Sequence, residues 1–172
     1  VIYMAFGVVR TDLMYGTDVG TGLVSVKYLG SDGSTPTAIE NGNVLNIGDL
    51  IAGEREVYVG GAVAANDAVK DVVLVSAPEV AYDERVRNLD EYINEAGKIV
   101  RGYRFHKGDI FSVNKEALVG KASPAKDDIV EFTAGTKLNV AASATSGSTV
   151  LGKIIAVETA GRYTYYVIRV EA

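Results

Sequence analysis

The sequence predicts a mainly β protein, α+β by count, made of two related small β-modules or barrels of short strands with one connecting amphipathic helix. Three observations predict this fold class. Short runs rich in β-branched residues recur between Gly, Ala and Asn along most of the 172 residues. One central segment changes to helical spacing. Two stretches, one on each side of that segment, align with each other.

The first half of the chain carries four predicted strands. Residues 23–28 alternate imperfectly between apolar and polar side chains, and residues 30–34 follow with an Asp-Gly pair typical of a hairpin turn. Three further apolar runs are separated by turn-forming residues, and they are residues 44–50, 56–59 and 69–75.

The central segment, residues 83–96, is predicted to be the helix. Its apolar residues are spaced by three, four and three positions, which places them on one helical face; they are Val86, Leu89, Ile93 and Ala96. Gly97 supplies a stop signal. The opposite face is charged and is expected to be solvated; it comprises Glu84, Arg87, Asp90, Glu91 and Glu95.

Short strands resume after the helix. We predict them at residues 99–105, 110–113, 129–132, 137–142, 150–158 and 163–170, with hairpin-like linkers at 143–148 and 159–162. The resulting domain organisation is an N-terminal arm with the first β-module over 1–80, the connecting helix over 81–98, and a C-terminal β-barrel-like module over 99–172.

An internal repeat supports two related modules. Residues 45–69 align with residues 105–129 without a gap, and eight positions are identical against about two expected by chance. Gly-Asp should form a tight turn before a strand, and a later Asp should cap the next turn. Accidental reuse of Gly-Asp turns stays an open alternative. The identical pairs are Gly48 and Gly108, Asp49 and Asp109, Glu56 and Glu116, Val59 and Val119, Gly60 and Gly120, Ala62 and Ala122, Ala65 and Ala125, and Asp67 and Asp127.

Composition excludes several functions. Seventeen basic against twenty-two acidic residues give a net charge of −5, which argues against a nucleic-acid partner. The chain has no cysteine and one histidine, His106, which removes disulfides, thiol catalysis and Cys- or multi-His-ligated metals. No apolar run approaches the ~18 residues of a membrane span. We therefore expect no cofactor, no metal and no membrane partner.

Catalytic chemistry is not predicted. His106 lies beside a Gly-Asp turn, and no Gly-x-Ser-x-Gly motif provides a nucleophile. Two groups of carboxylates are candidates for acid/base work or cation binding, but turn and cap roles explain them better. We therefore expect a protein that is not an enzyme. The carboxylates are Asp127, Asp128 and Glu131 in one group and Asp83 and Glu84 in the other.

Interaction residues are predicted at both ends of the chain. The apolar stretch 1–9 precedes Arg10, the reverse of a secretory signal, so we interpret it as a buried strand or docking arm. Strand 163–170 is apolar on both faces, which indicates either a central strand or an intermolecular face. The predicted interaction residues are Val1, Ile2, Tyr3, Phe6, Arg10, Tyr15, Tyr163 and Tyr165.

Three stretches, residues 9–17, 82–97 and 103–113, combine Gly-Asp turns and short strands with Ala-, Gly- and Thr-rich loops elsewhere and no cysteine. This pattern resembles the auxiliary head proteins of tailed bacteriophages, the decoration or cement proteins. The resemblance implies a virion structural protein on the capsid surface, with the major capsid protein as its partner. It also implies a homo-oligomer, for which a trimer is one option. This sequence departs from the small single-barrel decoration proteins in its length and in its predicted helix. The alternative is a phage tail or fibre component, or an adhesin-like surface-binding module.

Overall fold

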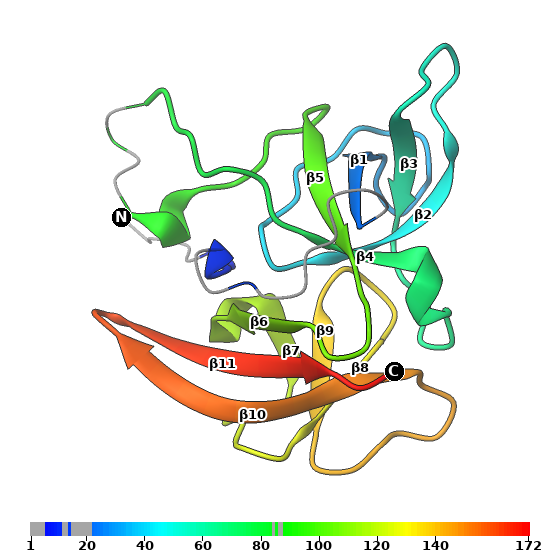
Figure 1. Cartoon of the computed structure of the whole chain (residues 1–172). Coiled ribbons are helices and arrows are strands. Elements are labelled where there is room, and N and C mark those ends of the chain that lie inside the picture. Colours follow the sequence, from blue (N-terminus) through cyan, green and yellow to red (C-terminus); the bar gives the residue numbers. More distant parts are fainter. Residues whose placement is uncertain (1–5, 12–13, 15–21, 84, 86–87) are drawn as a thin grey trace.

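Two β-sheets lie one above the other and share their apolar faces (Figure 1). The computed structural model describes residues 6–11, 14, 22–83, 85 and 88–172. The mainly β prediction is confirmed. The first sheet is a closed barrel of order β1-β3-β2-β4-β5, whose strands are Leu23–Tyr28, Val57–Gly61, Val44–Leu50, Val72–Val75 and Ile99–Arg104. The second is a six-stranded sheet of order β6-β11-β10-β8-β9-β7, whose strands are Ile110–Val113, Tyr163–Val170, Val150–Ala160, Ile129–Glu131, Leu138–Ala141 and Leu118–Gly120.

The first barrel closes because β1 pairs with strands on both sides. It runs parallel to β3 and antiparallel to β5, with Val26 opposite Tyr58 and Val100 respectively. A register shift in β2 between Ile47 and Leu50 bends that strand around the barrel. A Cβ added at Gly60 would lie 2.6 Å from Val26 Cγ1, so glycine allows the narrow interior to fill.

The second sheet is organised by the long hairpin of β10 and β11. β11 lies between β10 and β6, so the strand with two apolar faces is central. The structure thereby supports core packing for Tyr165 and Ile168, which are 2% and 0% exposed. The sheet ends in a parallel pair of β7 and β9, the counterpart of the parallel pair of β1 and β3 in the first barrel.

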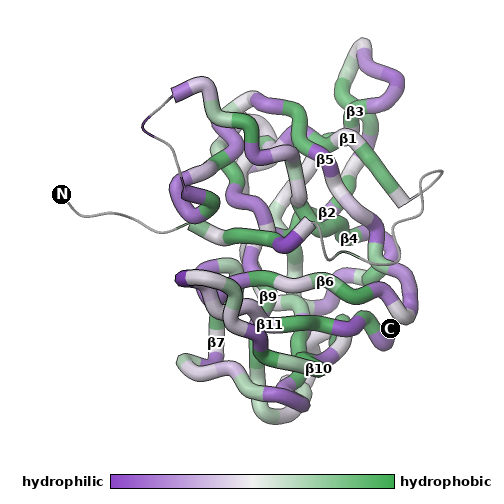
Figure 2. The backbone as a smooth tube through the Cα atoms, turned by 60° about the vertical axis from the view of Figure 1, so that its left-hand side comes forward, coloured by the Kyte–Doolittle hydropathy of each residue, from purple (hydrophilic) through white to green (hydrophobic). Residues whose placement is uncertain are grey.

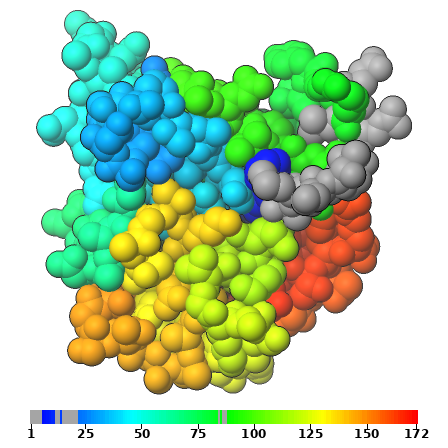
Figure 3. Space-filling model, turned by 180° about the vertical axis from the view of Figure 1, so that it is seen from behind, coloured from blue at the N-terminus to red at the C-terminus, as the bar shows by residue number. Residues whose placement is uncertain are grey.

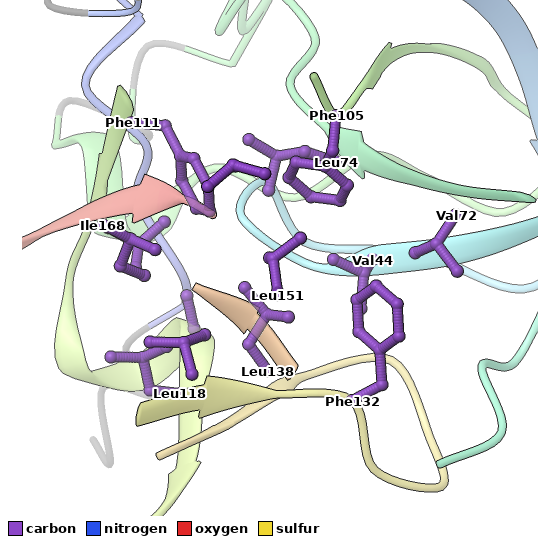
Figure 4. Close-up of a cluster of buried hydrophobic side chains, with 14 of the residues drawn as sticks. Val44, Val72, Leu74, Phe105, Phe111, Leu118, Phe132, Leu138, Leu151 and Ile168 are labelled. Carbon is purple, nitrogen blue, oxygen red and sulfur yellow. The ribbon is translucent and has the colours of Figure 1, made fainter. Parts of the chain in front are cut away.

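One apolar core joins the two sheets. Figure 4 shows Val44, Val72, Leu74 and Phe105 of the first barrel packed toward residues of the second sheet, which are Phe132, Leu138, Leu151 and Ile168. Main-chain bonds cross the same boundary, from the Val44 N–H to the Thr136 carbonyl at 2.7 Å. The view from behind shows the two halves in continuous contact (Figure 3).

The predicted connecting helix is wrong. Within the described part of residues 83–96 the only helical element is the 3₁₀ turn η3, Leu89–Glu91, which Asn88 and Glu91 cap reciprocally. Leu89 is 38% exposed, whereas Tyr92 and Asn94 are buried, a period of two in place of the helical period. Asn94 forms an antiparallel bridge with Ile39, so tertiary pairing overrides the local spacing.

Of the two Gly-Asp turns that the repeat predicts, the structure contains one. Gly108 has a φ of +94°, and the turn before β6 is closed by the Asp109 N–H donating to the His106 carbonyl at 3.0 Å. Gly48 and Asp49 instead lie inside β2. That the two modules are related stays a prediction.

The capping Asp is found in both copies, one residue later in the second. Asp67 Oδ2 accepts the Ala64 N–H at 2.8 Å, and Asp128, in place of Asp127, accepts the Ala125 N–H at 2.7 Å. Asp127 adopts a positive φ of 71°.

Strand pairing also corrects two predicted hairpins. Residues 30–34 form a turn, with Asp32 Oδ1 accepting the Ser34 and Thr35 N–H groups, but β1 pairs with β3 and β5 rather than with β2. Residues 143–148 connect β9 to β10, and β8 lies between those two strands. The hairpin at 159–162 is confirmed by the pairing of β10 with β11. β5 completes the first barrel although the division at residue 98 assigns it to the C-terminal module; the domain division itself stays a prediction.

Candidate docking surface

Large apolar side chains are exposed where the chain leaves β4 and enters β5. Val80 is 57% exposed, Tyr82 98% and Ile99 50%. Ala77 is buried, and then Pro78 and a tight turn, in which the Val80 N–H donates to the Pro78 carbonyl at 2.9 Å, direct the chain outward. We call Val80, Tyr82 and Ile99 the apolar patch.

A network of buried amides anchors the segment that carries the apolar patch. Asn41 holds Ala77 by two hydrogen bonds, from the Ala77 N–H at 3.0 Å and to the Ala77 carbonyl at 2.9 Å. The Asn94 amide donates to Asn41 Oδ1 at 3.0 Å, and Tyr92 Oη donates to Asn94 Oδ1 at 3.1 Å. Lys98 Nζ donates to Tyr92 Oη at 2.7 Å. The outer lysine is thus connected to the barrel interior, and the surface is pre-organised.

Two shallow, open grooves flank the apolar patch. One of about 510 Å³ runs over β1 and β5 and is lined by Val24, Ala77, Val80, Lys98 and Arg101 among others. The other, of about 400 Å³, is lined by Val80, Tyr82, Tyr92, Glu95 and Lys98 among others. Val80 and Lys98 line both grooves, so the three features form one continuous surface. Exposed apolar side chains surrounded by polar ones are typical of protein-binding surfaces.

The charge beside the patch is held locally. The Arg85 guanidinium and N–H group bond to the exposed carboxylate of Asp83 at 2.7 to 3.1 Å, and these bonds lower the pKa of Asp83 to about 2. The carboxylate therefore stays ionised through the physiological range, and the patch keeps a polar rim.

The structure brings four of the predicted interaction residues together in a seam within the chain. The Phe6 N–H donates to the Asp90 carbonyl at 2.9 Å, and Tyr163 Oη donates to Asp90 Oδ1 at 2.8 Å. The Arg10 guanidinium lies 5.2 Å from the centroid of the Tyr165 ring. Val1, Ile2, Tyr3 and Tyr15 lie outside the described residues.

Residues 8–10 belong to the N-terminal segment that we interpreted as a buried strand or docking arm, and they pair with a sheet edge of their own chain. Val9 pairs with Val113 of β6, and the Arg10 N–H donates to the Ser112 carbonyl at 3.0 Å. The Val8 N–H donates to Asn114 Oδ1 at 2.9 Å. Residues 8–10 therefore extend the second sheet of their own chain, and their edge pairing is intramolecular.

Among the carboxylates considered for catalysis, Asp128 and Glu131 are engaged in structural bonds, and Glu84 lies outside the described residues. Burial raises the pKa of Asp128, but the Lys121 ammonium, 2.8 Å from both oxygens, and the Ala125 N–H lower it below its ordinary value. Burial likewise raises the pKa of Glu131, and bonds from Thr145 and the Asn139 amide outweigh it and lower the pKa. Among the described residues, no group of three or more acidic, histidine or cysteine side chains could hold a metal ion.

Sequence reasoning missed Val80, Tyr82 and Ile99. The signal that could have found them is that Val80 and Tyr82 follow Pro78 in a segment without strand periodicity. Apolar side chains there have no core face to join.

Comparison with protein-family models, with curated proteins and with solved structures found no match for this chain. In the described part of the chain, no helix is long and apolar enough to cross a membrane.

Proposed function

We propose that this chain is a structural virion protein that binds the outer surface of a phage capsid and reinforces or decorates it. The observation that carries the proposal is the apolar patch, in which Val80, Tyr82 and Ile99 are 57%, 98% and 50% exposed on an anchored segment of the first barrel. The resemblance of the sequence to decoration proteins supplies the partner, the major capsid protein.

The apolar patch fits a role in assembly because its contribution grows with copy number. Burying one tyrosine and two aliphatic side chains contributes on the order of a few kcal/mol, too little for a tight single contact after the cost of association. Identical contacts on a homo-oligomer add through effective concentration, so a trimer on a repetitive shell would bind strongly. Tyr82 of the patch is of a residue type that is enriched among the side chains that dominate binding energy at interfaces.

The test is co-sedimentation with undecorated heads of a tailed phage. We expect wild-type protein to pellet stoichiometrically, with Tyr82→Ser and Val80→Thr weakening binding by at least fivefold. Val157→Thr is the matched control, because Val157 is 45% exposed on β10, away from the patch. Light scattering gives the mass of the chain in solution, where we expect a homo-oligomer; a mass of three chains would indicate binding at three-fold positions.

Two results would overturn the proposal. Wild-type protein that stays in the supernatant would move the assignment to a tail, fibre or adhesin-like module. Equal binding by Tyr82→Ser, Val80→Thr and Val157→Thr would remove the apolar patch from the interface.

A further inference from the structure

A third groove, of about 720 Å³, lies at one end of the first barrel and is lined by basic side chains. Arg55 comes from the connection before β3, Lys70 from the 3₁₀ turn η2, Val69–Asp71, and Arg104 from the end of β5. His106 lies beside them. Leu23, Val24, Tyr58 and Phe105 supply an apolar floor, and Glu56 is the one described carboxylate in the lining. We call this the basic groove.

The cations of the basic groove have no carboxylate partner in the described part of the chain. The ion pairs found there involve other residues, so no described carboxylate lies within 4.0 Å of Arg55, Lys70 or Arg104. Arg104 is held in place by donating to the Lys70 carbonyl at 3.0 Å. A chain with a net charge of −5 thus gathers in one groove three cationic side chains that are not paired with a described carboxylate.

The basic groove is continuous with the docking surface. Leu23, Val24 and Ser25 line both this groove and the 510 Å³ groove beside the apolar patch. Lys98 and Arg101 line the latter, and none of its described lining residues is acidic. A partner segment that covers the apolar patch and continues along β1 therefore meets cations along its path.

We infer that the basic groove binds a carboxylate-rich, partly apolar segment of the partner protein; the identity of that partner as the capsid shell rests on the proposed function. Guanidinium groups pair with carboxylates through two parallel hydrogen bonds, and the apolar floor accommodates aliphatic side chains between the acids. A nucleic acid is disfavoured because the overall negative charge of the chain repels a dense polyanion.

The probe is a fluorescein-labelled octaglutamate peptide, followed by fluorescence anisotropy in 20 mM NaCl with the full chain. We expect binding that weakens about two- to fivefold in Lys70→Gln and in Arg55→Gln, the range for removal of one exposed charge pair. Lys126→Gln is the matched control, because Lys126 is an exposed lysine outside the groove and its substitution removes the same charge. Binding should also weaken at 150 mM NaCl.

Several outcomes overturn the inference. It fails if octaglutamate does not bind, or if all three variants bind equally. It also fails if labelled oligo-dT or a sulfated oligosaccharide of equal charge binds more tightly and loses affinity in the same two groove variants. Failure of the peptide assay leaves head co-sedimentation through the apolar patch intact, whereas groove-dependent peptide binding without co-sedimentation overturns only the capsid proposal.

Discussion

Each of the two sheets has an apolar face that must be buried, and the two sheets bury it in different ways. The first barrel closes on itself through β1, and its outer surface stays available for grooves and for the apolar patch. The second sheet stays open, and the first barrel covers its apolar face. Residues 8–10 extend this sheet at the edge strand β6. The comparison teaches that closing a sheet spares surface for binding, whereas an open sheet uses its face for cohesion.

The two halves also differ in the kind of polar group that they bury. The first barrel relies on neutral amides, with Asn41 and Asn94 bonded to main-chain groups and to each other. The second sheet buries carboxylates, with Glu131 0% exposed and Asp128 6% exposed. The buried carboxylates of the second sheet should therefore respond to acid, whereas the neutral amides Asn41 and Asn94 should not.

The tip of the loop between β2 and β3, which projects from the first barrel, is hydrophilic and belongs to neither core (Figure 2).

The largest expected effect tests whether the halves depend on one core. Phe132 is 0% exposed in the core shared by the two sheets, so Phe132→Ala should destabilise the protein by about 3 to 5 kcal/mol. Urea unfolding followed by tyrosine fluorescence and circular dichroism should give one transition at lower denaturant. Val157→Ala is the exposed control, and two separated transitions would show that the halves fold independently.

The next effect compares glycines, one from each half. A Cβ at Gly152 would collide with the Arg169 main chain, whereas at Gly60 it would meet the side-chain ends of Val26 and Leu45 at 2.6 and 3.0 Å. Main chain in a paired strand moves less readily than a side-chain end. Gly152→Ala should cost about 2 to 3 kcal/mol and Gly60→Ala about 1 to 2 kcal/mol. Thermal unfolding measures both, and the reverse order would contradict the comparison.

The third comparison concerns the acid sensitivity of the second sheet. Because the folded-state pKa of Glu131 is lowered, its stabilisation is complete above the unfolded pKa and is lost as pH falls through the folded value. Glu131→Gln should cost about 1.5 to 3 kcal/mol near pH 7, and its difference from wild type should narrow by pH 3. Urea unfolding from pH 7 to 3 measures this.

Glu158→Gln is the control for the acid test, since Glu158 is exposed on β10 of the same sheet. A constant difference between Glu131→Gln and wild type across pH would contradict the assigned role of Glu131.

Strand positions were predictable because their causes are local. The runs at 23–28, 44–50, 110–113 and 163–170 coincide with β1, β2, β6 and β11, where β-branched residues lie between turn formers. The helix failed because Leu89 and Ile93 satisfy helical spacing only in isolation. In the fold, Asn94 pairs with Ile39, which is 55 positions away. A pattern read over neighbouring residues cannot predict a pairing at that separation.

The candidate site was predictable only in its chemistry. Tyrosine enrichment favoured an intermolecular face, which stays a prediction. Tyr165 is 2% exposed, and Tyr82, outside any periodic run, is 98% exposed. Burial depends on which strands meet, and the parallel pair of β1 and β3 forms across a separation of about 30 residues.

The sequence by itself determined the β class, most strand positions, the acidic charge and the lack of cysteine chemistry, because composition and period-two patterning act locally. It did not predict β7, and residues 69–71 of the predicted strand 69–75 form the 3₁₀ turn η2. Only the tertiary structure decided that one sheet closes and the other does not, that residues 8–10 bind their own chain, and that cations from three separate segments meet in the basic groove. These features depend on long-range strand pairing, in which one extra residue or one competing partner changes what each side chain faces.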